Sequence, residues 1–149
     1  MFGIKHTEIV CTVSGSCKDK HAHPMPAYRR YVESHIVQVR AHAGRYPFYI
    51  LSGLYGLIPA DKMIRNYDYV LVEDKVGEFA ERVRLQMARR RIRTILYSHA
   101  PGTTDWGVYT RALNMAADLN GTQIINMMFP TVREGAAILP QVTDAPAIA

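Results

Sequence analysis

Three apolar runs in this chain each end in a serine that opens a short loop of small or polar residues. The three run-and-loop pairs are Ile9–Val13 with Ser14–Lys20, Phe48–Leu51 with Ser52–Gly56, and Thr94–Tyr97 with Ser98–Asp105. Short continuous apolar runs are typical of strands buried on both faces, as in a parallel sheet. If these strands are parallel, their carboxyl ends share one edge, and open α/β sheets bind ligands at that edge.

Helical spacing of apolar residues fills the intervals between the runs. It predicts helices from Ala27 to the closing Gly44, from an N-cap at Asp74 to about Met87, and from about Trp106 to Leu119, the last with Val108, Ala112, Ala116 and Leu119 inward. Strands are expected at Glu8–Val13, Pro47–Leu51, Thr94–Tyr97 and Gln123–Met127, with ordered loop at Leu57–Pro59 and an edge strand as one interpretation of Tyr69–Val72. This alternation predicts an α/β fold with a mainly parallel sheet of four or five strands between helical layers.

The size of the chain, 149 residues, suits one domain with an ordinary core. We expect that domain to occupy residues 1–130, with 131–149 as an irregular tail. The apolar stretches are too short to span a bilayer, so a membrane partner is not expected. The amino-terminal residues lack the apolar core of a signal peptide, and two cysteines make no disulfide framework, so we expect a cytoplasmic protein.

The first loop has the richest chemistry. Ser14, Gly15 and Ser16 offer hydroxyls and backbone N–H groups, and Lys18 and Lys20 add positive charge, which suits an anion; a solvated lysine loop is the alternative. The loop matches neither nucleotide-binding glycine motif, and no cofactor is expected.

The same loop contains a cysteine and two histidines, residue types that bind metals or act as nucleophiles. Cys17 with His21 and His23 falls short of a closed zinc site, so no metal is expected. Cys17 beside two lysines is a candidate nucleophile, because nearby ammonium groups lower a thiol pKa.

The second and third loops add further candidates. Gly53 and Gly56 flank Tyr55 directly after a buried strand, so the backbone could approach a ligand on which Tyr55 stacks. Tyr67 and Asp68 follow in a long loop that could fold back over this edge. Tyr55 and Tyr67 as core aromatics that pin the loop are the alternative. In the third loop, Ser98 could touch a ligand and His99 could act as an acid or base.

Positive charge is concentrated in one segment. The net charge is +5, and six arginines lie between residues 82 and 93, with Arg89, Arg90 and Arg91 in succession. This pattern is typical of a solvated helix end, where cations oppose the helix dipole, or of a helix that contacts nucleic acid.

Several of these pieces together resemble a known family. The pieces are His23-Pro24 with Pro26-Ala27, Tyr31, Ile50-Leu51-Ser52, Tyr55-Gly56-Leu57-Ile58-Pro59, Asp61 and Tyr67-Asp68. They are similar to a family of small bacterial, archaeal and phage domains, distantly related to the peroxide-stress protein YaaA and to uracil-DNA-glycosylase-like domains. The resemblance implies a Rossmann-like or uracil-DNA-glycosylase-like fold with a cleft for nucleotide or nucleic acid. It carries a site role to Cys17, Lys20, Tyr31, Ser52, Tyr55, Gly56, Tyr67 and Asp68.

These observations lead to two main hypotheses. In the first, the chain binds a nucleotide, nucleobase or nucleic-acid segment at the strand ends, where Asp68, His99 or Cys17 would serve a glycosidic-bond or base-modifying reaction. In the second, it is a non-catalytic module that grips nucleic acid through the arginines between Arg82 and Arg93. A homo-oligomer formed through helix faces is a third hypothesis.

Overall fold

The computed structural model of the chain describes residues 7–15, 18–98 and 107–127. Its elements in chain order are β1 (Thr7–Val13), β2 (Met25–Pro26), α1 (Ala27–Arg30), α2 (Ser34–His42), β3 (Phe48–Ser52), β4 (Gly56–Pro59), β5 (Met63–Ile64), the 3-10 helix η1 (Glu73–Lys75), α3 (Val76–Arg89), β6 (Ile92–Ser98), α4 (Gly107–Asn120) and β7 (Gln123–Asn126). The predicted tail, 131–149, lies outside the described residues.

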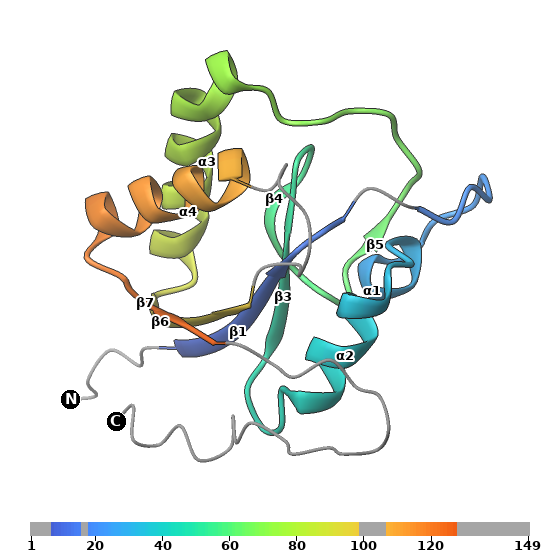
Figure 1. Cartoon of the computed structure of the whole chain (residues 1–149), viewed down its shortest axis with the longest axis horizontal. Helices are drawn as coiled ribbons and strands as arrows, with labels where there is room; N and C mark the ends of the chain where they lie inside the picture. Colours follow the sequence, from blue (N-terminus) through green and yellow to red (C-terminus); the bar gives the residue numbers. More distant parts are fainter. Residues whose placement is uncertain (1–6, 16–17, 99–106, 128–149) are drawn as a thin grey trace.

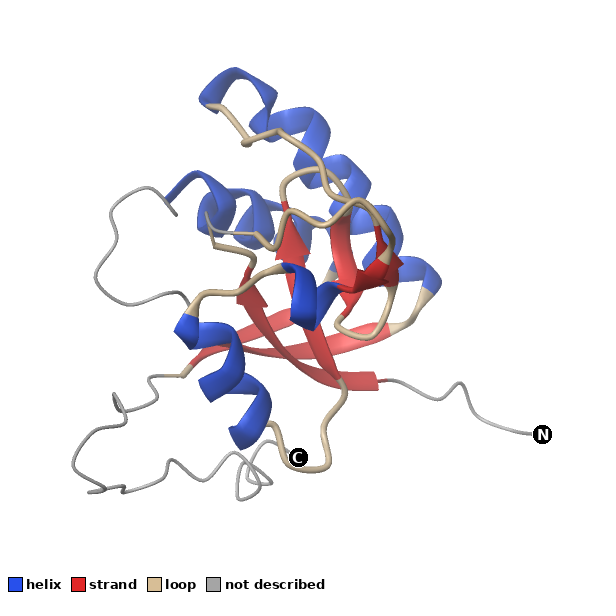
Figure 2. Cartoon of the chain, turned by 90° about the vertical axis from the view of Figure 1, so that its right-hand side faces the viewer, coloured by secondary structure: helices blue, strands red, loops and turns tan. Residues whose placement is uncertain are grey.

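A five-stranded, mainly parallel sheet forms the centre of the molecule (Figure 2). The strand order is β4-β3-β1-β6-β7, in which β3, β1, β6 and β7 are parallel and β4 is antiparallel at one edge. Strands β1 and β6 are central, and their continuous apolar runs are buried because helices cover both faces. The predicted α/β class and mainly parallel sheet are confirmed.

Helices cover the sheet on two sides (Figure 1). On one face, α3 and α4 pack over Ile9, Cys11 and Ile95 in the largest core cluster. On the other face, Val39 of α2 packs over Val10 and Leu96. Alternate residues of β1 therefore pack against different helical layers, because successive side chains of a strand point to opposite faces.

The order of connections creates a switch point in the sheet. The chain runs from β1 outward to β3, crosses back past β1 to β6, and continues away to β7. Crevices beyond the carboxyl ends of strands at such a point are the usual ligand sites of open α/β sheets. Because Val13 pairs with Leu51 and Thr12 with Ser98, Ser14, Ser52 and Ser98 all lie at this carboxyl edge.

The region between Ala27 and Gly44 differs from the single helix that the spacing predicts. The helix stops at Arg30 and resumes at Ser34, because Tyr31 and Glu33 adopt extended conformations. Tyr31 instead pairs with Lys18 in an isolated antiparallel bridge. The break leaves Val32, which the pattern placed inward, about half exposed.

The segment from 53 to 75 also departs from prediction. Gly56–Pro59 is strand β4 rather than loop, because it pairs with β3 through a tight turn. Tyr69–Val72 is not a strand, and the amino end of α3 is capped at Lys75 rather than Asp74, since η1 precedes the helix. In α4, Ala112 and Ala116 face inward as predicted, but Leu119 is 64% exposed near the helix end.

Strands β2 and β5, which the sequence pattern did not reveal, form a small antiparallel sheet beside α1. Among the described residues, every helix is too short or too polar to cross a bilayer.

Candidate functional site at the carboxyl edge

Three hydroxyl groups, of the buried Tyr31 and Ser52 and the half-buried Tyr67, meet beside the end of β3. The Tyr31 hydroxyl donates to Ser52 Oγ at 2.8 Å, and the Tyr67 hydroxyl lies 2.7 Å from Tyr31 Oη and 3.1 Å from Ser52 Oγ. A closed ring satisfies all three: Tyr31 donates to Ser52, Ser52 to Tyr67 and Tyr67 to Tyr31. Burial raises the pKa of both tyrosines, so the ring stays neutral at ordinary pH.

Two further predicted residues surround Tyr67. The Lys18 ammonium lies 4.6 Å from the centre of the Tyr67 ring, and Tyr55 meets that ring edge-on at 5.5 Å. The Tyr55 N–H donates to Ser52 Oγ at 3.2 Å. We call Lys18, Tyr31, Ser52, Tyr55 and Tyr67 the tyrosine cluster. It joins the first loop, the break after α1, the β3–β4 turn and the long loop, as core aromatics that pin a loop would do.

The loop after β1 contacts two residues that the sequence analysis did not single out. Gly15 has a φ of +84°, and a Cβ there would lie 2.6 Å from Oε1 of Glu33. His35 is 5% exposed, and its Nε2 lies 2.8 Å from the Val13 carbonyl oxygen, so Nε2 carries the proton. Its Nδ1 lies 3.6 Å from Glu33 Oε1. The predicted Ser14 is buried next to them, with its N–H on the Leu51 carbonyl.

The predicted Lys20 lies in an exposed stretch whose backbone carbonyls are bound by a buried arginine. Arg30 is fully buried and donates to the carbonyl oxygens of Asp19, His21 and His23 at 2.6–2.9 Å. Asp19 Oδ1 accepts from the His21 N–H at 2.9 Å, and bonds to His21 lower the pKa of Asp19. Lys20 is therefore displayed on a stretch with a fixed backbone.

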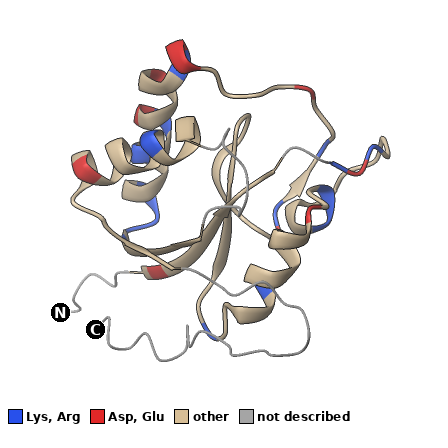
Figure 3. Cartoon of the chain, in the orientation of Figure 1, with Lys and Arg blue, Asp and Glu red and all other residues tan. Residues whose placement is uncertain are grey.

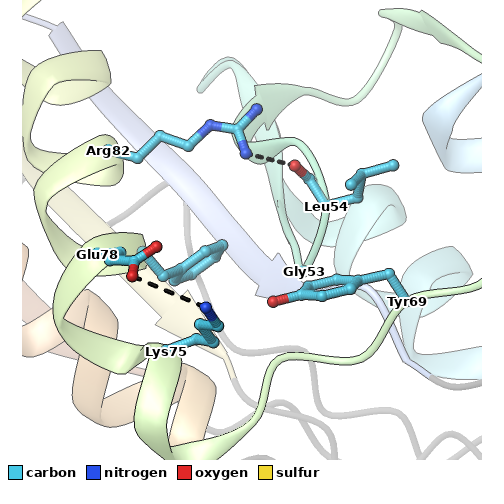
Figure 4. A pocket seen from close by; sticks show the side chains of 7 residues that line it. Gly53, Leu54, Tyr69, Lys75, Glu78 and Arg82 are labelled. Atoms are coloured by element: carbon cyan, nitrogen blue, oxygen red, sulfur yellow. Dashed lines mark hydrogen bonds and ion pairs between the residues drawn. The ribbon is translucent and has the colours of Figure 1, made fainter.

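A pocket of about 240 Å³ lies between the β3–β4 turn and α3, on the side of the turn away from the tyrosine cluster (Figure 4). We call it the carboxyl-edge pocket. It is lined by Gly53, Leu54, Tyr69, Lys75, Glu78, Phe79 and Arg82. In Figure 4, Arg82 reaches from α3 to the Leu54 carbonyl, and Tyr69 directs its hydroxyl toward the helix from across the opening.

The charges of this pocket come from α3 and from Lys75, the last residue of η1. Lys75 Nζ lies 3.8 Å from Glu78 Oε2, both side chains are more than half exposed, and Arg82 donates to the Leu54 carbonyl oxygen. Two cations against one carboxylate leave one net positive charge.

Steric crowding requires a glycine at position 53. A Cβ at this position would come within 2.7 Å of the Tyr109 hydroxyl, which accepts a hydrogen bond from the Leu71 N–H at 3.0 Å. Tyr109 of α4 thus holds the long loop against the β3–β4 turn. Tyr69 lies two residues before the bound Leu71 and lines the pocket. The composition of the second loop indicated Gly53, but no local pattern indicated Tyr69, Lys75 or Glu78.

The remaining predicted residues lie as follows. Asp68 is exposed between Tyr67 and Tyr69, and Ser98 is buried with its carbonyl oxygen accepting from the Thr12 hydroxyl. Gly56 has a φ of +80° and packs against the Gln86 amide. Ser16, Cys17 and His99 lie outside the described residues. Within the described part of the chain, no group of three or more acidic, histidine or cysteine side chains could hold a metal ion.

The arginines expected on one helix are divided. Helix α3 ends at Arg89; Arg90 follows it, Arg91 adopts a φ of 55° to turn the chain, and Arg93 lies on β6. Arg84 pairs with Glu81 and Arg82 lines the carboxyl-edge pocket. We call Arg89, Arg90, Arg91 and Arg93 the arginine cluster. It lies at the amino edge of the sheet, where the turn into β6 carries basic residues in Figure 3.

No family model, curated protein or solved structure matches the chain.

Proposed function

We propose that the chain binds a small ligand that combines a planar ring with a phosphate, a nucleotide or a fragment of one, in the carboxyl-edge pocket. The observation that carries this proposal is the pocket itself, in which an aromatic ring faces two cations at the ligand-binding edge of an α/β sheet. A volume of about 240 Å³ is below the roughly 300–1,000 Å³ of pockets for drug-sized ligands, which favours one ring over a dinucleotide.

Each wall of the pocket has a role in this proposal. Tyr69 stacks on the ring, since its side chain is 38% exposed at the opening. Lys75 and Arg82 bind the phosphate, and Lys75 exchanges its exposed ion pair with Glu78 for the ligand, which costs little. The Gly53 backbone allows close approach from the β3–β4 turn.

A reaction on the base or the glycosidic bond extends this proposal. Such a reaction needs a positioned carboxylate; Glu78 lines the pocket, and Asp68 adjoins the lining residue Tyr69 in the chain. The tyrosine cluster then supports the turn from behind rather than touching the ligand.

Isothermal titration calorimetry with nucleoside monophosphates, nucleosides and ribose 5-phosphate tests the proposal. We expect one site that prefers the monophosphate over either fragment. Lys75→Gln or Arg82→Gln should each weaken binding about tenfold, since a hydrogen bond to a charged group contributes roughly 1.5–3 kcal/mol. Tyr69→Leu should remove the preference for monophosphate over ribose 5-phosphate.

Arg84→Gln is the matched control, because Arg84 lies on the same helix but pairs with Glu81 outside the pocket. It should bind as the parent chain does. Absence of heat with every ligand, or equal losses in Arg84→Gln and Arg82→Gln, would reject the proposal.

A further inference from the structure

A second cavity lies at the opposite, amino edge of the sheet and takes no part in the site above. Its volume is about 340 Å³. Two aromatic rings line it, Tyr28 from α1 and Phe48 from the start of β3, with Pro59 at the end of β4. Tyr28 and Phe48 are only partly buried, so their rings remain accessible from the cavity.

One cation and one carboxylate border these rings. The Arg40 guanidinium lies 4.0 Å from the centre of the Tyr28 ring, and Asp61 is exposed on the same cavity. A guanidinium stacked on an aromatic ring makes a flat, positively charged wall. Such a wall suits a planar group that is attached to an anion.

Tyr49 borders the cavity, but its ring packs on the other face of β3, in the core under α3 and α4, and there it contacts the arginine cluster. Arg90 donates to the Tyr49 hydroxyl at 3.3 Å and lies 5.7 Å from the centre of its ring. Arg89, Arg91 and Arg93 are exposed, and among described residues they form no ion pair with a carboxylate. Charged side chains that lack internal partners are available to an external anion.

The charge balance of this edge favours a polyanion. Arg40 and the arginine cluster supply five cations, whereas Asp61 and Glu8, at the start of β1, supply two carboxylates. Aromatic rings next to a row of cations are the features that bind single-stranded nucleic acid, because bases stack on the rings while phosphates follow the cations. A duplex cannot enter such a cavity without extruding a base.

We propose that the amino edge binds single-stranded nucleic acid, with one base against Tyr28 and Phe48 in the cavity and the adjoining phosphates on the arginine cluster. This site is independent of the carboxyl-edge pocket. It selects single strands through the cavity and gains affinity through the arginines. An acidic peptide would use the arginines but not the aromatic cavity.

Fluorescence anisotropy with a labelled 12-nucleotide single strand, the same sequence as a duplex, and a labelled polyglutamate peptide tests the proposal. We expect the single strand to bind most tightly and its affinity to fall steeply with salt. The triple variant Arg89→Gln/Arg91→Gln/Arg93→Gln should flatten the slope of log K against log salt by about 2, from roughly 0.7 per lost phosphate contact. Arg84→Gln, on α3 but paired with Glu81, should leave the slope unchanged.

The cavity is tested separately from the arginines. Tyr28→Leu should weaken single-strand binding about tenfold and leave duplex binding nearly unchanged, as loss of one stacked base predicts. Arg40→Gln, an exposed change that is safe for folding, should weaken binding in the same direction, and circular dichroism checks both variants. Lys75→Gln should bind the single strand normally, whatever it does to nucleotides.

Three results would overturn the proposal. The first is an unchanged salt slope in the triple variant. The second is equal affinity for single strand and duplex that neither Tyr28→Leu nor Arg40→Gln alters. The third is binding of polyglutamate as tight as that of the single strand, which would assign the edge to an acidic protein partner.

Discussion

Arg30 is the residue that most directly fixes the shape of the first loop. Its guanidinium is fully buried, donates to three carbonyl oxygens of residues 19–23, and reaches the Ile64 carbonyl at 3.4 Å, while its Nε is without a partner among described residues. A buried charge is retained where it satisfies several backbone acceptors that nothing else reaches. Arg30 therefore links the loop to β5 and α1.

Replacing Arg30 tests this role. Arg30→Met leaves its carbonyl partners without a donor, so we expect the free energy of unfolding to fall by about 2–4 kcal/mol. Urea denaturation measures the loss, and limited proteolysis should cut near Ala22 much faster than in the parent chain. Arg29→Met removes the neighbouring exposed arginine and should change the stability by less than about 0.5 kcal/mol. Equal effects of the two changes would contradict the role of Arg30.

Buried acidic groups predict how the stability depends on alkaline pH. Burial raises the pKa of Cys11, Tyr31, Tyr67 and Tyr97 above the ordinary values of 9.0 for the thiol and 10.0 for the phenols. In the unfolded chain these groups lose protons near the ordinary values, whereas in the folded chain they keep them. The stabilisation is therefore complete below about pH 9 and is lost as the pH rises further.

Urea denaturation between pH 8 and pH 11 measures this dependence. Each such group should lower the stability by up to about 1.4 kcal/mol per pH unit once the unfolded chain ionises. The double variant Tyr31→Phe/Tyr97→Phe should reduce the slope of stability against pH by the contribution of about two groups. A decline that is equally steep in this double variant would show that other groups cause it.

At the scale of elements, Gln86 completes the outer edge of the sheet. Its Oε1 accepts from the Leu57 N–H at 2.7 Å and its Nε2 donates to the Tyr55 carbonyl at 3.0 Å, as a neighbouring strand would. Pro59, the next outward residue of β4, has no N–H to offer. Helix α3 thus protects an edge that could otherwise pair with another chain.

Gln86→Leu removes both of these hydrogen bonds while keeping the size of the side chain. We expect a loss of about 1–2 kcal/mol in stability and association that grows with protein concentration, measured by light scattering. Gln38→Leu on α2, whose side chain makes no hydrogen bond within the described residues, is the control and should remain as the parent chain. A Gln86→Leu variant that neither loses stability nor associates would contradict the protective role.

The sequence predicts those elements that arise from local patterns of residues, and it misses those that depend on distant contacts. Continuous apolar runs identify β1, β3 and β6, and helical spacing identifies α3 and α4, because burial on a sheet dictates those patterns. The break between α1 and α2 could not be predicted, since it depends on Tyr31 reaching Lys18 and Ser52. Strand β4 is four residues long and forms by pairing with β3, so no local pattern identified it.

The candidate site divides in the same way. Serines after buried strands indicated the carboxyl edge, and glycines beside an aromatic indicated the β3–β4 turn, which lines the proposed pocket. Tyr69 and Lys75 lie on either side of Leu71 in the chain, and the Leu71 N–H is bound by Tyr109, 38 residues away. A single sequence has no pattern that records such a contact, so these two residues were missed.

At the scale of the whole molecule, we propose that the two ends of one sheet bind different ligands, a nucleotide at the carboxyl edge and single-stranded nucleic acid at the amino edge. The carboxyl edge has a small pocket with one net positive charge, while the amino edge has an aromatic cavity beside the arginine cluster. The parallel sheet separates them, because crossover connections place loops at both of its ends. Changes at one edge should therefore leave binding at the other unaffected.

Amide chemical-shift mapping during titration with adenosine 5′-monophosphate tests the carboxyl-edge pocket most directly. We predict saturable shifts concentrated at Gly53, Leu54, Tyr69 and Lys75, with Gly121, at the far end of α4, unmoved. Shifts confined to the amino edge, or a spectrum that does not change at millimolar ligand, would contradict the assignment of that pocket as the nucleotide site.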